Sequence, residues 1–211
     1  MPTATTTPAR PMPTRSDPPA GRVRLNVGGG KGHPVMRDWT VVDLRESADV
    51  VLDITEKALP HADSSVDLLV CSHTLEHVPR ARLGFVLSEF LRVVKPVAKG
   101  GVVRIAVPDI EQACRAYVAG DEAFFRKADL TYADPDAPLG GLLASWFYSV
   151  SAVGNGHVNC FDFGSMSWWL KRAGFARVER STYRGSRVED LRAEGIDLHP
   201  HESLYVEAFK E

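Results

Sequence analysis

The chain has 211 residues, a formal net charge of -2 at pH 7 and a sequence pI near 6.4. This length allows one α/β domain with a sizeable core and excludes two full domains beside a tail. A charge so close to zero does not draw the whole molecule onto a polyanion. We therefore expect a small-molecule partner, no nucleic acid, and a monomer or homodimer.

The cysteines and the apolar segments indicate the compartment. Cys71, Cys114 and Cys160 are widely spaced, and none forms a Cys-x-x-Cys pair. The sequence has no run of eighteen apolar residues and no N-terminal signal segment. We expect a cytoplasmic protein with reduced thiols and no membrane partner.

The amino-acid composition of the chain changes sharply near residue 22. Residues 1–21 hold six of the fourteen prolines, which predicts a disordered tail before a single domain over residues 22–211. Short, nearly continuous apolar runs then predict buried parallel strands. The runs lie at 23–27, 40–43, 49–53, 66–72 and 100–108.

Helical spacing follows the fourth run. Apolar residues recur at steps of three and four from after His77 through Lys95, and Pro96 ends this helix. A second helix is predicted at 165–173 with Gly174 as its C-cap, followed by β-like runs at 175–183 and 203–209. The stretch 109–159 is aromatic and too long for a simple connection. It is expected to form a lid over a site, a small satellite core or a dimer contact.

A glycine cluster ends the first predicted strand. Gly28, Gly29 and Gly30 leave backbone that a ligand can approach closely, although a simple tight turn would need the same residues. Asp43 ends the next strand, where a carboxylate can accept hydrogen bonds from both hydroxyls of a ribose. Only thirteen positions separate Gly30 from Asp43, against the roughly 20 of a dinucleotide fingerprint. The short spacing favours a nucleoside such as S-adenosylmethionine (SAM) over NAD.

With these features the sequence resembles the class I methyltransferases. The matching segments are LeuAsnValGlyGlyGly at 25–30, TrpThrValValAsp at 39–43, AlaAspValValLeuAspIle at 48–54, the stretch 59–78, LeuArgValValLysPro at 91–96 and GlyGlyValValArgIleAlaValPro at 100–108. The resemblance implies a Rossmann-like, seven-stranded, mostly parallel sheet with an antiparallel C-terminal strand and helices on both faces. It also implies SAM as cofactor and S-adenosylhomocysteine (SAH) as product.

The resemblance places the cofactor on particular residues. Asp43 would hold the ribose, Asp53 and Ile54 the adenine, and Ser72 with His73 the methionine portion; Asp53 can instead be a turn or helix cap. The full set of candidates is Asn26, Gly28, Gly29, Gly30, Asp43, Leu44, Asp53, Ile54, Ser72 and His73.

His73 to His77 also read as H-x-x-E-H, the motif of inverted zinc proteases. That motif needs a helix and a third ligand, whereas these residues directly follow a predicted strand. We therefore expect no metal, and Glu76 and His77 to cap a helix or form a structural hydrogen bond.

Methyl transfer mainly requires alignment of donor and acceptor, with a base where the acceptor carries a proton. The candidates for that base are His73, Asp109 and His157, the last of which can equally be an ordinary loop histidine. The expected function is O- or N-methylation of a small molecule. The alternatives are a SAM-binding protein without methylating activity and a zinc hydrolase.

Overall fold

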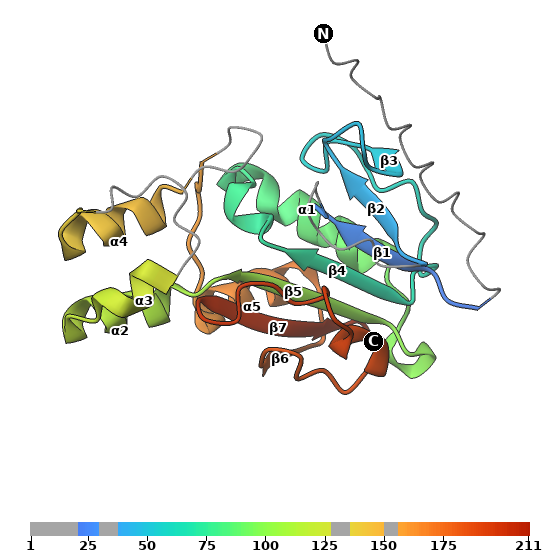
Figure 1. The fold of residues 1–211 in the computed structure, drawn as a ribbon. Coiled ribbons are helices and arrows are strands. Elements are labelled where there is room, and N and C mark those ends of the chain that lie inside the picture. Colours follow the sequence, from blue (N-terminus) through green and yellow to red (C-terminus); the bar gives the residue numbers. More distant parts are fainter. Residues whose placement is uncertain (1–20, 30–37, 128–135, 150–155) are drawn as a thin grey trace, which may run out of the picture.

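The computed structural model describes residues 21–29, 38–127, 136–149 and 156–211. Within them the backbone forms one seven-stranded sheet in the order β3-β2-β1-β4-β5-β7-β6 (Figure 1). The strands are β1 (Arg24–Val27), β2 (Thr40–Asp43), β3 (Val50–Val51), β4 (Leu68–Ser72), β5 (Val102–Pro108), β6 (Arg177–Ser181) and β7 (Ser203–Phe209). The expected seven strands are confirmed, with the third shorter than its apolar run.

Because of their direction, the strands β1 to β5 have the loops at their carboxyl ends on the same edge of the sheet. The five strands β1 to β5 pair in parallel, and β7 runs antiparallel to both β5 and β6. From β1 the chain builds outward first through β2 and β3, and later on the other side through β4 and β5. Open α/β sheets bind ligands beyond the carboxyl ends of the strands where the order reverses in this way. That position lies between β1 and β4.

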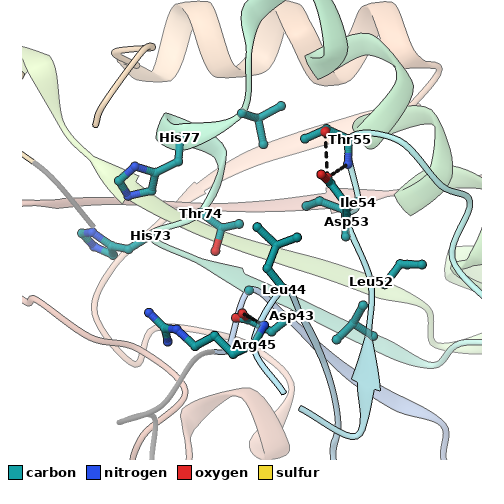
Figure 2. Close-up of a pocket in the computed structure, with 13 residues that line it drawn as sticks. Asp43, Leu44, Arg45, Leu52, Asp53, Ile54, Thr55, His73, Thr74 and His77 are labelled. Atoms are coloured by element: carbon teal, nitrogen blue, oxygen red, sulfur yellow. Dashed lines mark hydrogen bonds between the residues drawn. The ribbon is translucent and has the colours of Figure 1, made fainter. Parts of the chain in front are cut away.

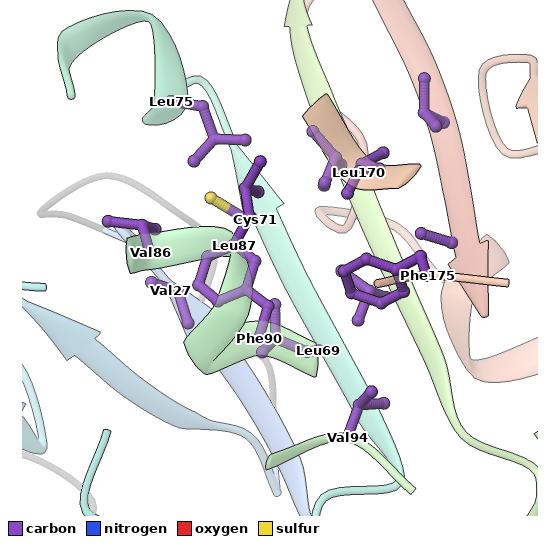
Figure 3. Packing of buried hydrophobic residues seen from close by; sticks show 14 of the residues in the cluster. Val27, Leu69, Cys71, Leu75, Val86, Leu87, Phe90, Val94, Leu170 and Phe175 are labelled. Atoms are coloured by element: carbon purple, nitrogen blue, oxygen red, sulfur yellow. The ribbon is translucent and has the colours of Figure 1, made fainter. Parts of the chain in front are cut away.

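Two long helices cover one face of the sheet. These are α1 (Arg80–Val93) and α5 (Phe163–Ala173), which pack on each other. Figure 3 shows Leu87 and Phe90 of α1 beside Leu69 and Cys71 of β4, and Leu170 of α5 belongs to the same buried cluster. Because side chains alternate along a strand, the other residues of β4 point to the opposite face. There Leu68 and Val70 pack against Trp39 and the 3-10 helix η3 (Glu189–Arg192).

The helix ends follow from local capping. Asp162 and Ser165 form a capping box that starts α5 at Phe163, two residues before the predicted start. Gly174 closes the helix with φ of 109°, so the predicted C-cap is confirmed. The helix α1 begins only after Pro79, and the residues before it form a short 3-10 helix, η1 (Leu75–His77).

The stretch after β5 folds as a separate helical group on one side of the sheet (Figure 1). It contains α2 (Ile110–Ala119), α3 (Glu122–Lys127) and α4 (Leu139–Phe147). Phe125, Leu142 and Trp146 are buried together with Ala113 and Ala116. Of the three roles expected for this stretch, the satellite core is therefore present. Tyr132, one of its aromatic residues, lies outside the described residues.

Arg104 is a charged residue at the centre of the sheet. It lies in β5 with 1% of its surface exposed. Its guanidinium donates to both carboxylate oxygens of Asp197, at 2.7 and 2.6 Å, and to Glu207 of β7 at 3.0 Å. Two carboxylates thus compensate the buried cation, as such burial requires.

Candidate functional site

An open cleft lies beyond the carboxyl ends of β1, β2 and β4 (Figure 2). The space within it amounts to about 650 Å³, part of which is open to solvent. The residues that line it are Gly28, Val42, Asp43, Leu44, Arg45, Leu52, Asp53, Ile54, Thr55, His73, Thr74, His77 and Val78. Six predicted cofactor residues are therefore brought together here: Gly28, Asp43, Leu44, Asp53, Ile54 and His73.

Gly28 forms the floor of the cleft at the end of β1. Its φ is 77°, and its N–H donates to the Val42 carbonyl at 2.8 Å. A Cβ at this position would lie 1.9 Å from Thr74 Oγ1, so only glycine fits here. Gly29 is also tight, because a Cβ would lie 2.5 Å from Asn26 Nδ2. Gly30 lies outside the described residues.

The two aspartates stand on neighbouring loops of the cleft. Asp43 ends β2, and its Oδ1 accepts the backbone N–H of Arg45 at 3.0 Å. Asp53 Oδ1 accepts both the N–H and the hydroxyl of Thr55, at 2.8 and 2.7 Å. Asp53 thus lines the cleft and also makes the local turn that was its alternative role.

Asn26 and Ser72 lie beneath the cleft and do not line it. They are 1% and 2% exposed. Among the described residues, neither the Asn26 amide nor the Ser72 hydroxyl has a hydrogen-bond partner. Asn26 packs beside Gly29, so it supports the glycine turn from below.

His73 joins the cleft to a buried polar region. Its φ is 48°, a left-handed conformation that non-glycine residues rarely adopt. Its Nε2 lies 2.7 Å from Ser203 Oγ, and its ring lies 4.4 Å from that of His199. On the other side its Nδ1 is 3.5 Å from Glu76 Oε1.

The polar region behind the cleft contains His73, Glu76, His77, His157, His199 and Glu202, which we call the histidine–glutamate cluster. His77 Nε2 lies 3.9 Å from Glu76 Oε1, and its ring centre is 4.8 Å from that of His157. Glu202 Oε1 is 3.3 Å from His199 Nδ1, while its Oε2 accepts the Trp146 indole N–H at 3.2 Å. The helical group therefore reaches the cluster through α4.

Burial dominates the electrostatics of this cluster. It raises the pKa of Glu76 to about 8, and the nearby charge of Glu202 adds to the increase. Burial also lowers the pKa of His157 to about 4, with a further contribution from His77. His157 is therefore neutral at pH 7.

Glu76 and His77 were expected to cap a helix or form a structural hydrogen bond, and His77 Nδ1 does lie within hydrogen-bond distance, 3.2 Å, of the Gly156 carbonyl. Both side chains also face the cluster, while the Glu76 carbonyl accepts the N–H groups of Val158 and Asn159 at 2.8 and 3.1 Å. Those two bonds hold the segment of His157 against η1. The H-x-x-E-H spacing was the available signal for Glu76 and His77, whereas no local pattern marks His199 or Glu202.

Asp109 is the N-cap of α2 and is 1% exposed. Its carboxylate accepts the Glu111 N–H, the Gln112 amide and the Arg180 guanidinium, at 3.0, 3.1 and 3.0 Å. Asp109 is not among the described residues that line the cleft. The Asp109 carboxylate is thus engaged in three hydrogen bonds, which compete with its use as a base.

The cleft lies in a segment with recognisable relatives. A family model described as a methyltransferase domain matches residues 25–103, which include β1 to β4 and the start of β5. Residues 25–103 therefore resemble a methyltransferase domain. The matched residues contain the whole lining of the cleft.

Curated relatives match less than half of the chain. An uncharacterized methyltransferase of Mycobacterium tuberculosis strain H37Ra is 36% identical over 111 residues, which cover 44% of this chain and 41% of the relative. One from Mycobacterium leprae strain TN is 33% identical over 111 residues, covering 44% of this chain and 39% of that protein. The match thus spans about two fifths of the relatives' own length.

Solved structures share the fold over most of the chain. A SAM dependent methyltransferase from Archaeoglobus fulgidus has a TM-score of 0.53 at 16% identity, covering 90% of this chain and 87% of the other. A possible histamine N-methyltransferase from Thermotoga maritima has a TM-score of 0.51 at 16% identity, with 90% and 83% covered. These likenesses confirm the Rossmann-like fold.

None of the helices in the described ranges has the length and apolar character needed to cross a lipid bilayer.

Proposed function

We propose that this protein is a SAM-dependent methyltransferase that acts on a hydroxyl or amine of a small molecule. The observation that carries the proposal is the cleft of the methyltransferase domain, with glycine backbone at the end of β1 and a carboxylate at the end of β2. The chemistry of the lining fits SAM, because a nucleoside needs close backbone approach, a ribose acceptor and apolar walls.

Each part of the cofactor has a counterpart in the lining. Gly28 gives the approach for the methionine portion, and Asp43 is the acceptor for the ribose hydroxyls. Leu44, Leu52 and Ile54 supply the apolar walls for the adenine. Leu44 is 49% exposed, so a bound ring would cover apolar surface that now faces solvent.

The acceptor would enter at the end of the cleft that His73 and His77 line. SAM supplies a methyl group on a sulfonium, which is already a good leaving group, so the chain's own work is to align the acceptor and remove its proton. His73 is the base candidate that lines the cleft, and His157 stands beside His77 in the cluster behind it. Trp146 of α4 reaches the cluster behind this end, where it donates to Glu202.

The experiment is a calorimetric titration of the purified protein with SAM and SAH, with NAD as the comparison ligand. We expect SAM and SAH to bind and NAD not to bind. Transfer of a labelled methyl group to a panel of small phenols, alcohols and amines then tests the activity. A folded protein that binds neither SAM nor SAH would refute the proposal, and binding without transfer to any acceptor would favour a non-methylating SAM-binding protein.

A further inference from the structure

We propose that Glu76, His77 and His157 bind one divalent transition-metal ion at the acceptor end of the cleft. One ligand atom from each residue lies within 4.8 Å of the other two. Two imidazoles and one carboxylate form the donor set of several catalytic zinc and non-haem iron sites, which leave coordination positions open for substrate. His77 also lines the cleft, so an ion bound here faces it.

The carboxylate of Glu76 is the first argument for an ion. Glu76 is 1% exposed, and neither of its oxygens has a hydrogen-bond partner among the described residues. A buried carboxylate without hydrogen bonds is strongly unfavourable, whereas a cation at the same place compensates it. The neighbouring Glu202 carboxylate increases the need for positive charge in this region.

The second argument is the orientation of the two imidazoles. His77 Nδ1 lies 3.2 Å from the Gly156 carbonyl, to which it can donate only if it carries the ring proton. Its Nε2 is then the unprotonated nitrogen, and this is the atom that lies 3.9 Å from Glu76 Oε1. His157 in turn hydrogen-bonds with the backbone of Trp146. Backbone carbonyls hold metal-binding histidines in this way, because they fix both the tautomer and the ring direction.

These ligands differ from those of the H-x-x-E-H hydrolase motif. In that motif the two histidines bind the metal and the glutamate is the base. Here His73 Nε2 is engaged by Ser203 Oγ at 2.7 Å, and η1 is a three-residue 3-10 helix. Glu76 takes the place of His73 as a ligand, and His157 comes from a segment 80 residues further along the chain.

The role of the ion in catalysis rests on the proposed function, whereas the presence of a metal site does not. A hydroxyl oxygen of the acceptor that binds the ion loses its proton more readily. The O–H bond breaks and the proton passes to solvent; the oxygen then forms its bond to the methyl carbon as the C–S bond of SAM breaks and SAH leaves. The acceptor class is therefore a molecule with a metal-coordinating hydroxyl, such as a phenol with an adjacent oxygen donor.

Metal binding is measured directly on the full chain after chelator treatment and dialysis. We expect one equivalent of Zn²⁺ by calorimetry, and a Co²⁺ absorption spectrum typical of a site with nitrogen and oxygen ligands. His157→Ala and Glu76→Gln should each weaken Zn²⁺ binding at least about tenfold, since even second-shell changes cost this much. Glu76→Gln keeps the side-chain shape, so its folding can be checked by circular dichroism and thermal unfolding.

The matched control is His201→Ala, which removes an exposed histidine of the same C-terminal region and should leave Zn²⁺ affinity unchanged. The proposal is overturned if the wild-type protein binds no Zn²⁺ at micromolar concentrations, as would follow if a protonated His73 alone compensates Glu76. It is also overturned if both variants bind Zn²⁺ as the wild type does. SAM binding without Zn²⁺ binding would reject the metal site alone, and Zn²⁺ binding without SAM binding would reject the proposed function alone.

Discussion

Gly28 and Thr74 approach each other so closely that a single added carbon on Gly28 would lie 1.9 Å from the Thr74 hydroxyl oxygen. The contact joins the turn after β1 to the loop after β4. It therefore fixes the two walls of the cleft at the point where the strand order reverses.

Gly28→Ala should lower the free energy of unfolding by about 2–5 kcal/mol. The left-handed backbone costs an alanine roughly 1–2 kcal/mol, and the overlap with Thr74 adds about 1–3 kcal/mol. Urea denaturation followed by circular dichroism measures the change. The control is Gly84→Ala on the exposed side of α1, where a Cβ meets no atom within 4 Å and should stabilise by about 0.5–1 kcal/mol. Equal effects at the two positions would contradict the tight contact.

Asp43→Ala should weaken SAM binding and leave the fold intact. It removes a charged acceptor for the ribose hydroxyls, worth about 1.5–3 kcal/mol per hydrogen bond, or roughly ten- to more than hundredfold in affinity. Calorimetric titration with SAM and SAH checks this. Glu46→Gln, at an exposed carboxylate of the same loop outside the cleft lining, should bind SAM as the wild type does. Unchanged affinity of Asp43→Ala would place the cofactor elsewhere.

Glu89→Gln should destabilise the protein at neutral pH and have little effect at low pH. Hydrogen bonds from Arg92 chiefly hold the pKa of Glu89 below its ordinary value, with further help from the Leu59 N–H. A carboxylate with a lowered pKa stabilises the fold above its unfolded pKa, near 4.5, and this contribution is lost as pH falls through the folded pKa.

Unfolding of the wild type and Glu89→Gln at pH 7 and pH 3 tests this dependence. The difference should be about 2 kcal/mol at pH 7, the scale of hydrogen bonds to a charged group. It should shrink as the wild-type carboxyl becomes protonated. A difference that is the same at both pH values would show that charge is not the cause.

Asp197→Ala should reduce the free energy of unfolding by about 3–5 kcal/mol, because it leaves the buried Arg104 guanidinium without its bidentate partner. Asp190→Ala is the comparison at the surface, where Asp190 pairs with Arg22 and Arg24. Such partly exposed pairs contribute at most about 1 kcal/mol. Thermal unfolding of both variants measures the contrast, and similar losses would mean that burial does not govern the Arg104 pair.

The apolar runs predicted the sheet because strands buried on both faces must be apolar at nearly every position. The third run shortened to Val50–Val51, since this edge strand has only β2 beside it and Asp53 already begins a turn. The apolar run at 100–108, in turn, did not indicate that Arg104 within it is buried and that its charge is compensated. Its partners Asp197 and Glu207 lie 93 and 103 residues away, beyond the range of any local pattern.

Part of the candidate site could be predicted from the sequence, and part could not. Gly28 and Asp43 each follow a strand directly, so their place beyond the sheet could be inferred from the chain alone. The histidine–glutamate cluster could not be assembled from the sequence, because Glu76, His157 and Glu202 come from segments that are far apart in the chain. The pattern at 73–77 was visible, but its chemistry depends on which distant groups the fold brings beside it.

The position of β7 determines when the sheet can be completed during synthesis. The strand lies between β5 and β6 and pairs Val206 with both Ile105 and Arg180. The ribosome releases β1 to β6 first, and the groove between β5 and β6 stays unfilled until residues 203–209 emerge. Until then the edge of β5 exposes unpaired backbone groups that another strand can capture. The seven residues 203–209 thus complete the sheet, and the edge of β5 in the nascent chain stays open to pairing with another strand until they have been synthesised.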